Sequence, residues 1–224
     1  MGAQPSSNEA EEELRRIRAL VLEMCVRGES MVGQAVRSVV ERDPHLARAV
    51  LAADRALDEL EVRLDGLCVR FLAMRQPTGL ALRTVTATLK MVTELERIGD
   101  LAVNVAERGL DLTAARGMEA SSHLPRMGEH VVEMFRLAAD AYVGNDASVE
   151  PLLSQRDDAV DELNRAAFKM WLAQMADHPD QADRALAFTS ISRYLERIGD
   201  HIVNLGQLIV LMVEGRDVRH DSST

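Results

Sequence analysis

Hydrophobic residues recur at alternating intervals of four and three along much of this chain. The most regular run has its apolar residues at Leu46, Val50, Ala53, Leu57, Leu60, Leu64, Leu67, Phe71 and Met74. This spacing places the apolar side chains on one face of an α-helix. Residues 9–41 carry a similar stripe that is interrupted at Gly28, and the Asp43-Pro44 pair that follows is typical of a helix N-terminus. The pattern therefore predicts two long helices before residue 76.

A third helix is predicted over residues 79–114, and it is apolar on two sides. One apolar line consists of Leu82, Val85, Leu89, Val92, Gly99, Val103, Ala106 and Leu110. The other consists of Leu95, Ile98, Ala102 and Val105. A helix with two apolar lines packs against two partners, so we expect it inside a bundle. Glu96 interrupts the first line, which is an unusual place for a carboxylate.

The second half of the chain repeats this plan. Residues 113–122 (TAARGMEASS) are small and polar, which predicts a domain boundary. Further helices are predicted over residues 123–143 and 147–176, and a sixth ends near Glu214, where Gly215 fits a C-cap. The predicted fold is all-α, with two tandem three-helix bundles related by an internal repeat over residues 1–116 and 117–224.

The clearest repeat lies in the third helix of each half. Residues 95–104 read LERIGDLAVN and residues 195–204 read LERIGDHIVN, so eight of ten positions are identical. Glu96 and Asp100 are four residues apart, as are Glu196 and Asp200, so each pair shares one helix face. Like charges at this spacing repel by roughly 0.2–0.5 kcal/mol unless a cation lies between them.

A second acidic pair precedes each repeat. DRALDEL holds Asp54 and Asp58, and DDAVDEL holds Asp157 and Asp161. Because these helices neighbour the repeat helices, we expect four carboxylates to converge in each half, with Asn104 and Asn204 beside them. Such groups need a raised pKa or a bound cation, and oxygen ligands suit Mg²⁺, Mn²⁺, Ca²⁺ or iron. Solvated helix faces with Arg97 and Arg197 as the neutralising charges remain the alternative.

The charge balance narrows the class of partner. The chain has 26 Lys and Arg against 36 Asp and Glu, which gives a formal net charge of −10. Proteins that bind nucleic acid present a basic face to the phosphates, so we expect no nucleic-acid partner. The acidic excess fits a protein that concentrates cations or docks on basic partners.

Several other signals exclude classes of protein. No apolar run reaches the roughly 18 residues of a membrane-spanning helix, and the N-terminal sequence lacks the pattern of a signal peptide, which predicts a cytoplasmic protein without membrane insertion. The motifs GxSxG, HExxH, GxxxxGK[ST] and ExxH do not occur, so we expect neither an enzyme nor an organic cofactor. Cys25 and Cys68 have no metal-binding or redox spacing, and we expect both to be small buried hydrophobes.

At these residues the chain resembles the PhoU family of phosphate-specific transport system accessory proteins. LERIGD followed by VN in each half is similar to the duplicated signature of that family, and DxxxDEL matches its other acidic motif. The similarity covers residues 12–215 and is strongest over residues 182–215. It implies two three-helix bundles in tandem, which agrees with the helical pattern.

The resemblance implies regulation rather than catalysis. Family members link a phosphate ABC transporter, through its ATPase subunit, to a sensor histidine kinase, and they repress the phosphate-starvation response and phosphate uptake. The resemblance also implies iron or zinc, or other divalent ions, on Asp54, Asp58, Glu96, Asp100, Asp157, Asp161, Glu196 and Asp200. We expect a cytoplasmic protein that reaches the inner face of the membrane through its partners. A homodimer is left open.

The two halves differ at two positions near the acidic pairs. Glu94 precedes the first repeat glutamate by two residues, whereas Tyr194 has the equivalent place in the second half. Arg156 stands where the first half has Ala53, and there it could weaken metal binding to the second acidic pair. Two alternatives stay open: a metal-free adaptor whose carboxylates bind arginines of a partner, and a carboxylate-bridged metal enzyme or metal store.

Overall fold

A computed structural model describes residues 7–113 and 122–218, and within these ranges the chain forms six long α-helices and no strand. The helices are α1 (Ser7–Val40), α2 (Pro44–Arg75), α3 (Gly79–Thr113), α4 (His123–Gly144), α5 (Val149–Asp177) and α6 (Ala182–Glu214). A short 3₁₀ helix, η1 (Pro179–Gln181), precedes α6. The predicted all-α class is therefore confirmed.

The helix ends follow local side-chain chemistry. The Asp43 carboxylate accepts a hydrogen bond from the His45 N–H at 2.8 Å, which caps α2 as predicted. Helix α6 ends at Glu214, and its C-cap Gly215 has a φ of 76°, in the left-handed region that favours glycine. Helix α5 begins at Val149 rather than at the predicted residue 147. There the Asp146 carboxylate accepts hydrogen bonds from the backbone N–H and the hydroxyl of Ser148, which keeps these residues in a turn.

The predicted apolar face of α2 is buried along most of its length. Leu57 and Leu64 are at most 1% exposed, whereas Met74, which the pattern also placed on this face, is 69% exposed. The prediction for Met74 was wrong because an α-helix drifts by about 20° per heptad relative to a strict seven-residue repeat. Cys25 and Cys68 are both buried, as expected.

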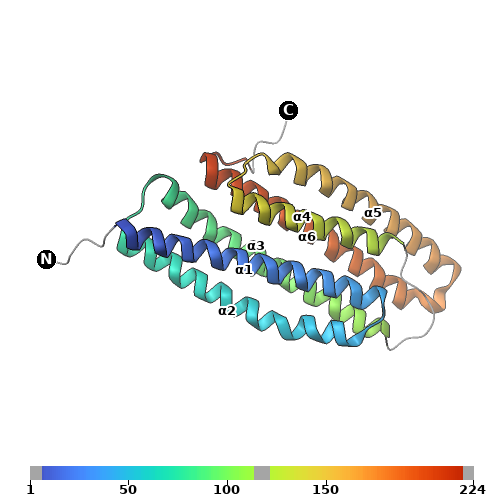
Figure 1. Cartoon of the computed structure of the whole chain (residues 1–224). Helices are drawn as coiled ribbons and strands as arrows, with labels where there is room; N and C mark the ends of the chain where they lie inside the picture. The colour runs from blue at the N-terminus through green and yellow to red at the C-terminus, as the bar shows by residue number, and fades with distance from the viewer. Residues whose placement is uncertain (1–6, 114–121, 219–224) are drawn as a thin grey trace.

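Helices α3 and α6 lie at the centre of the molecule (Figure 1). Helix α3 contacts α1, α2 and α6, and helix α6 contacts α3, α4 and α5. The prediction that α3 packs on two sides is confirmed, since Val92 and Leu95 from its two apolar lines are at most 1% exposed. The repeated sequences therefore lie on the two most enclosed helices.

The two halves lie side by side, each with three helices that contact one another (Figure 1). Across the junction, α3 packs on α6 and α1 packs on α4. The buried hydrophobic residues of both halves form one continuous cluster. The predicted domain boundary after residue 116 lies outside the described residues and stays a prediction. No helix within residues 7–113 and 122–218 is long and apolar enough to cross a bilayer.

Candidate functional site

The eight predicted ligands lie on the four helices that the sequence pattern assigned to them. The first carboxylate set comprises Asp54 and Asp58 on α2 with Glu96 and Asp100 on α3, and the second comprises Asp157 and Asp161 on α5 with Glu196 and Asp200 on α6. Helix α2 packs on α3, and helix α5 packs on α6. Each carboxylate set therefore lies along one helix–helix junction within its own half.

The first carboxylate set gathers around Gly99. A Cβ added at Gly99 would collide with Leu57 Cδ2 and would lie 3.9 Å from Asp54 Oδ1. A larger residue at position 99 would therefore force the Leu57 side chain to move. Burial raises the pKa of Asp54, and the charges of Asp58 and Asp100 raise it further. The effect of Asp100 shows that Asp54 of α2 and Asp100 of α3 lie near each other.

The side chain of Glu96 is more buried than that of Asp100, the other acid of its repeat. Its side chain is 21% exposed, compared with 48% for Asp100. Burial raises the pKa of Glu96, and the nearby charge of Asp100 adds to the shift. The carboxylate that interrupts the apolar line of α3 is thus held at the edge of the core beside another acid.

The positively charged side chain of Arg97 forms ion pairs within the first carboxylate set. Arg97 Nε lies 3.5 Å from Glu96 Oε2, and Arg97 Nη1 lies 3.3 Å from Asp100 Oδ2. The Arg97 side chain is 57% exposed, so solvent weakens both ion pairs. One of the two neutralising arginines considered from the sequence therefore does contact both acids of its repeat.

The second carboxylate set is packed more tightly than the first. A Cβ added at Gly199 would collide with the carboxylate of Asp157, so the backbone of α6 itself forms one wall around this acid. Asp157 Oδ1 is buried and has no hydrogen-bond partner among the described residues. Burial raises the pKa of Asp157 to about 7, and the charges of Asp200 and Asp161 add to the shift.

The arginines near the second set are directed differently. Among the described residues Arg197 makes no ion pair with Glu196 or Asp200, although its charge lowers the pKa of both. Arg156, which was expected beside the second acidic pair, forms an ion pair with Glu133 of α4 instead. The alignment of Arg156 with Ala53 gave its position along α5 but not its ion-pair partner. That partner, Glu133, lies on a different helix, so spacing along the chain does not identify it.

One further acid faces the first set and was not predicted as a ligand. The charges of Asp58 and Asp100 both raise the pKa of Glu61, although burial contributes most to the shift. Glu61 also raises the pKa of Glu96, so the two side chains lie near each other. Its spacing of three residues from Asp58 is the signal that could have identified it. The equivalent residue of α5 is Asn164, so the halves differ here.

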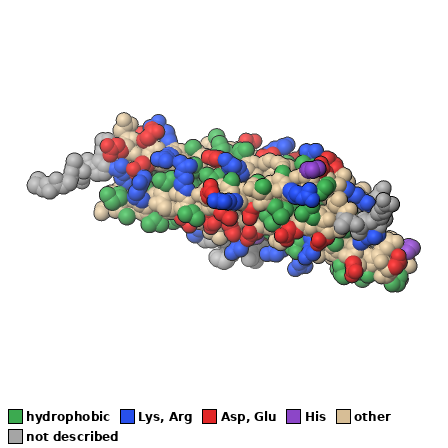
Figure 2. Space-filling view, turned by 90° about the horizontal axis from the view of Figure 1, so that it is seen from below, with side chains coloured by type: hydrophobic (Ala, Val, Ile, Leu, Met, Phe, Trp, Pro, Cys, Tyr) green, Lys and Arg blue, Asp and Glu red, His purple; other side chains and the backbone are tan. Residues whose placement is uncertain are grey.

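The carboxylates lie near one another but do not form a closed ligand cage. Within residues 7–113 and 122–218, no three His, Cys, Asp or Glu side chains are close enough to hold one metal ion as they stand. Carboxylates without a cation repel one another, and the groups at these junctions are only partly buried. Figure 2 shows acidic side chains gathered near the middle of one long face, with basic side chains among them.

Polar residues next to the repeats join the two halves. Glu94 Oε2 on α3 lies 2.7 Å from His201 Nδ1 and accepts a hydrogen bond from Asn204 Nδ2 at 3.1 Å. Asn204 was expected beside the second carboxylates, but its amide reaches toward α3 instead. His201 therefore contacts α3 as well.

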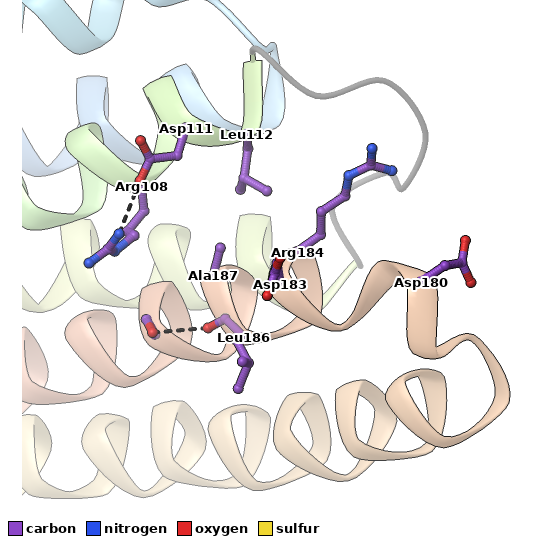
Figure 3. Close-up of a pocket in the computed structure, with 9 residues that line it drawn as sticks. Arg108, Asp111, Leu112, Asp180, Asp183, Arg184, Leu186 and Ala187 are labelled. Carbon is purple, nitrogen blue, oxygen red and sulfur yellow. Dashed lines mark hydrogen bonds and ion pairs between the residues drawn. The ribbon is translucent and has the colours of Figure 1, made fainter.

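A hollow of about 620 Å³ lies between the end of α3 and the start of α6 (Figure 3). Arg108 donates a hydrogen bond to Asp111 at 3.0 Å on one wall, and Asp183 and Arg184 lie on the other. Because acidic and basic side chains alternate around it, the hollow favours neither an anion nor a cation.

The sequence is similar to a known protein family along both halves of the chain. The PhoU domain family model matches residues 21–109 and 124–209, one stretch in each half of the chain. A Pseudomonas putida protein named "Phosphate-specific transport system accessory protein PhoU homolog" is 35% identical over 212 residues, which cover 93% of this chain and 82% of that protein. A Caulobacter vibrioides protein of the same name is 35% identical over 208 residues, covering 92% of this chain and 90% of that protein.

Solved structures show the same arrangement of helices. The crystal structure of PhoU from Pseudomonas aeruginosa superimposes with a TM-score of 0.88 at 33% sequence identity. The alignment covers 92% of this chain and 99% of that chain. Both halves of the sequence and the complete fold therefore match, and the chain belongs to the PhoU family.

Proposed function

We propose that this protein is a cytoplasmic regulator of phosphate homeostasis that couples a phosphate ABC transporter to a sensor histidine kinase. Its relatives are named as accessory proteins of phosphate-specific transport systems, which supports a role in phosphate transport. In this role the protein represses the phosphate-starvation response and limits uptake when phosphate is plentiful. It reaches the inner face of the membrane through the kinase and the ATPase subunit of the transporter.

Metal binding is the second part of the proposal, and the second carboxylate set supports it best. Asp157 Oδ1 is a buried carboxyl oxygen without a hydrogen-bond partner among the described residues, and the backbone at Gly199 leaves room for it only because glycine lacks a Cβ. Asp157, Asp161, Glu196 and Asp200 would hold a divalent or iron-type ion with oxygen ligands. A bound ion would neutralise charges whose mutual repulsion otherwise weakens the α5–α6 junction.

A metal-free role has support at the first carboxylate set. Arg97 already contacts Glu96 and Asp100, and both ion pairs are accessible from solvent. Such acids can also bind arginines of a partner protein, because guanidinium groups pair with carboxylates in a fixed geometry. A carboxylate-bridged enzyme or metal store is the weaker alternative, since the sequence lacks the Glu-x-x-His pairs of ferritin-like di-iron proteins.

Gene deletion tests the regulatory role directly. Cells without this protein should express phosphate-starvation genes in phosphate-rich medium, and the wild-type gene on a plasmid should restore repression. Unchanged expression in the deletion strain would contradict the proposal.

A matched pair of variants tests whether the carboxylates matter for repression. Glu196→Gln with Asp200→Asn should fail to restore it, whereas Glu11→Gln with Asp140→Asn should succeed. The second variant removes the same charge at exposed sites on α1 and α4. Metal analysis of protein purified without chelator then distinguishes the metal-bound adaptor from the metal-free one.

A further inference from the structure

One long face of α5 is exposed from end to end. Helix α5 packs on α4, α6 and η1 and lies at an edge of the molecule (Figure 1). Away from these contacts, exposed residues follow one another at alternating intervals of four and three: Pro151, Gln155, Asp158, Glu162, Arg165, Lys169, Leu172 and Ala176. We call this set the outer stripe of α5. Its spacing is typical of a helix that packs lengthwise against another helix, over about 38 Å here.

The charges of the outer stripe change sign at its midpoint. Asp158 and Glu162 lie on the N-terminal side, and Arg165 and Lys169 lie on the C-terminal side. None of the four makes an ion pair with another residue in the described parts of the chain. The two acids are four residues apart, as are the two bases, so like charges are neighbours on the helix and repel one another. A surface with the opposite order of charges would relieve this repulsion.

A second copy of α5 supplies that order when it lies antiparallel to the first. The intervals of the stripe read the same in both directions, so a two-fold axis can pass midway between Glu162 and Arg165. The axis places Asp158 opposite Lys169 of the second copy. It also places Glu162 opposite Arg165 of the second copy. Because a two-fold axis repeats every contact, all eight charges are then paired with an opposite charge.

The ends of the stripe add apolar surface to the same contact. The axis places Leu172 opposite Gln155, and Ala176 opposite Pro151, so no like charges meet there. Leu172 is 54% exposed, and Phe168, which precedes it by four residues and borders the stripe, is 51% exposed. Covering these side chains removes apolar area from water and favours association.

The equivalent face of α2 provides an internal comparison and lacks this complementarity. Arg55 and Glu59 stand at the places of the two acids, and they pair with each other at 3.1 Å within α2. Gly66 stands where α5 has Lys169. Two copies of α2 in this register would place Arg55 opposite Gly66, whereas α2 against α5 would place Arg55 opposite Lys169, a like charge. The pattern therefore selects α5 against α5.

We propose that the outer stripe of α5 is a homodimer interface, in which two copies of this chain pack antiparallel about a two-fold axis between Glu162 and Arg165. This proposal goes beyond the regulatory role and does not depend on bound metal. The contact uses only the second half of each copy, so α1, α2 and α3 stay open to other partners. Its ion pairs are exposed, so salt should weaken the dimer.

Sedimentation equilibrium of the full chain tests the proposal, with chelator present so that no cation bridges the acids. The wild-type protein should change from monomer to dimer as its concentration rises, and added NaCl should shift the equilibrium toward monomer. A monomer at every concentration would overturn the proposal. Open-ended polymers would also overturn it, because a two-fold contact closes after two copies.

Charge reversal tests the register of the two helices. Lys169→Glu and Asp158→Lys should each weaken self-association by about tenfold or more, since each places like charges opposite each other twice. An equimolar mixture of the two variants should recover association to within about threefold of wild type. In the mixed dimer the new carboxylate faces the new ammonium, and the unchanged Asp158 and Lys169 face each other. A mixture that stays monomeric would show that these positions do not meet.

Two controls exclude other causes. Lys90→Glu makes the same charge change at an exposed site on α3 and should alter association by less than about twofold. If it weakens the dimer as much as Lys169→Glu does, net charge governs association and the proposed interface is wrong. The urea unfolding midpoint shows whether each variant is folded, and Arg165→Glu with Glu162→Arg offers a second pair for the same mixing experiment.

Discussion

The carboxylate of Asp157 on α5 lies so close to Gly199 on α6 that no other residue fits at position 199 without displacing it. Gly99 has the equivalent place on α3, where its close neighbour is Leu57 rather than the acid. Each repeat glycine thus allows a close approach of two helices. Among the described residues, only the approach in the second half buries a carboxyl oxygen without a hydrogen-bond partner.

Gly199→Ala should destabilise the protein although alanine favours helices. The added Cβ would displace Asp157, and overpacking of this kind typically costs about 1–3 kcal/mol, which exceeds the gain in helix propensity of about 1 kcal/mol. Gly66→Ala is the control, because a Cβ at Gly66 meets nothing within 4 Å. It should stabilise α2 by up to about 1 kcal/mol. Urea unfolding midpoints measure both, and equal shifts of the two variants would contradict the close approach.

The stability of the metal-free protein should fall as the pH rises from 5 to about 7. The pKa of Asp157 is raised from an ordinary 3.8 to about 7, so in this window the folded chain binds a proton that the unfolded chain has lost. The free energy of unfolding therefore decreases with pH and levels off above about 7. Burial also raises the pKa of Glu196 and Asp200, which adds to the effect in the same direction.

Urea titrations at several pH values in the presence of chelator measure this dependence. Asp157→Asn should flatten the profile, since its side chain does not ionise. The conservative control Asp146→Asn removes an acid whose pKa is lowered by its hydrogen bonds to Ser148. It should leave the slope between pH 5 and 7 unchanged. A wild-type midpoint that rises with pH through this window would refute the prediction.

Divalent cations should raise the unfolding midpoint of the protein, and a chelator should reverse the effect. A ligand that binds only the folded state adds about 2.7 kcal/mol of stability at one hundred times its Kd. Thermal melts with Mn²⁺, with Mn²⁺ plus chelator, and with an equal ionic strength of NaCl separate specific binding from screening. An identical increase with NaCl would show that screening of the acidic surface is sufficient.

Arg83→Ala should weaken the docking of the two halves. Arg83, near the start of α3, donates hydrogen bonds to the backbone carbonyls of Met212 and Val213 at 3.1 Å each, near the end of α6. Losing these charge-assisted bonds should cost about 1–3 kcal/mol. Arg55→Ala removes an arginine that is 87% exposed and paired only within α2, and should cost less than about 0.5 kcal/mol. If both variants lose a similar free energy of unfolding, the Arg83 hydrogen bonds do not stabilise the contact between α3 and α6.

Most of the fold follows from features that are local in the sequence. Apolar spacing, the Asp43 cap and Gly215 predicted the helices because helix formation depends on neighbours within a few turns. The same spacing misplaced Met74, since the strict seven-residue pattern drifts off the buried face of a real α-helix. Repetition of LERIGD also predicted which helices carry the carboxylates and that each half has its own set.

The sequence by itself determined the six helices, their paired acids and the relationship between the two halves, because these depend on periodicity and on identity at fixed spacing. Only the tertiary structure decided which charges meet. Arg97 turned toward its own repeat, Arg156 toward Glu133 of α4, and Glu94 toward His201 across the junction. The direction of a long side chain depends on which oppositely charged groups, on its own helix or on a neighbouring one, lie within reach. The burial of Asp157 Oδ1 likewise depends on how closely α5 approaches α6, a distance between helices that no spacing along the chain encodes.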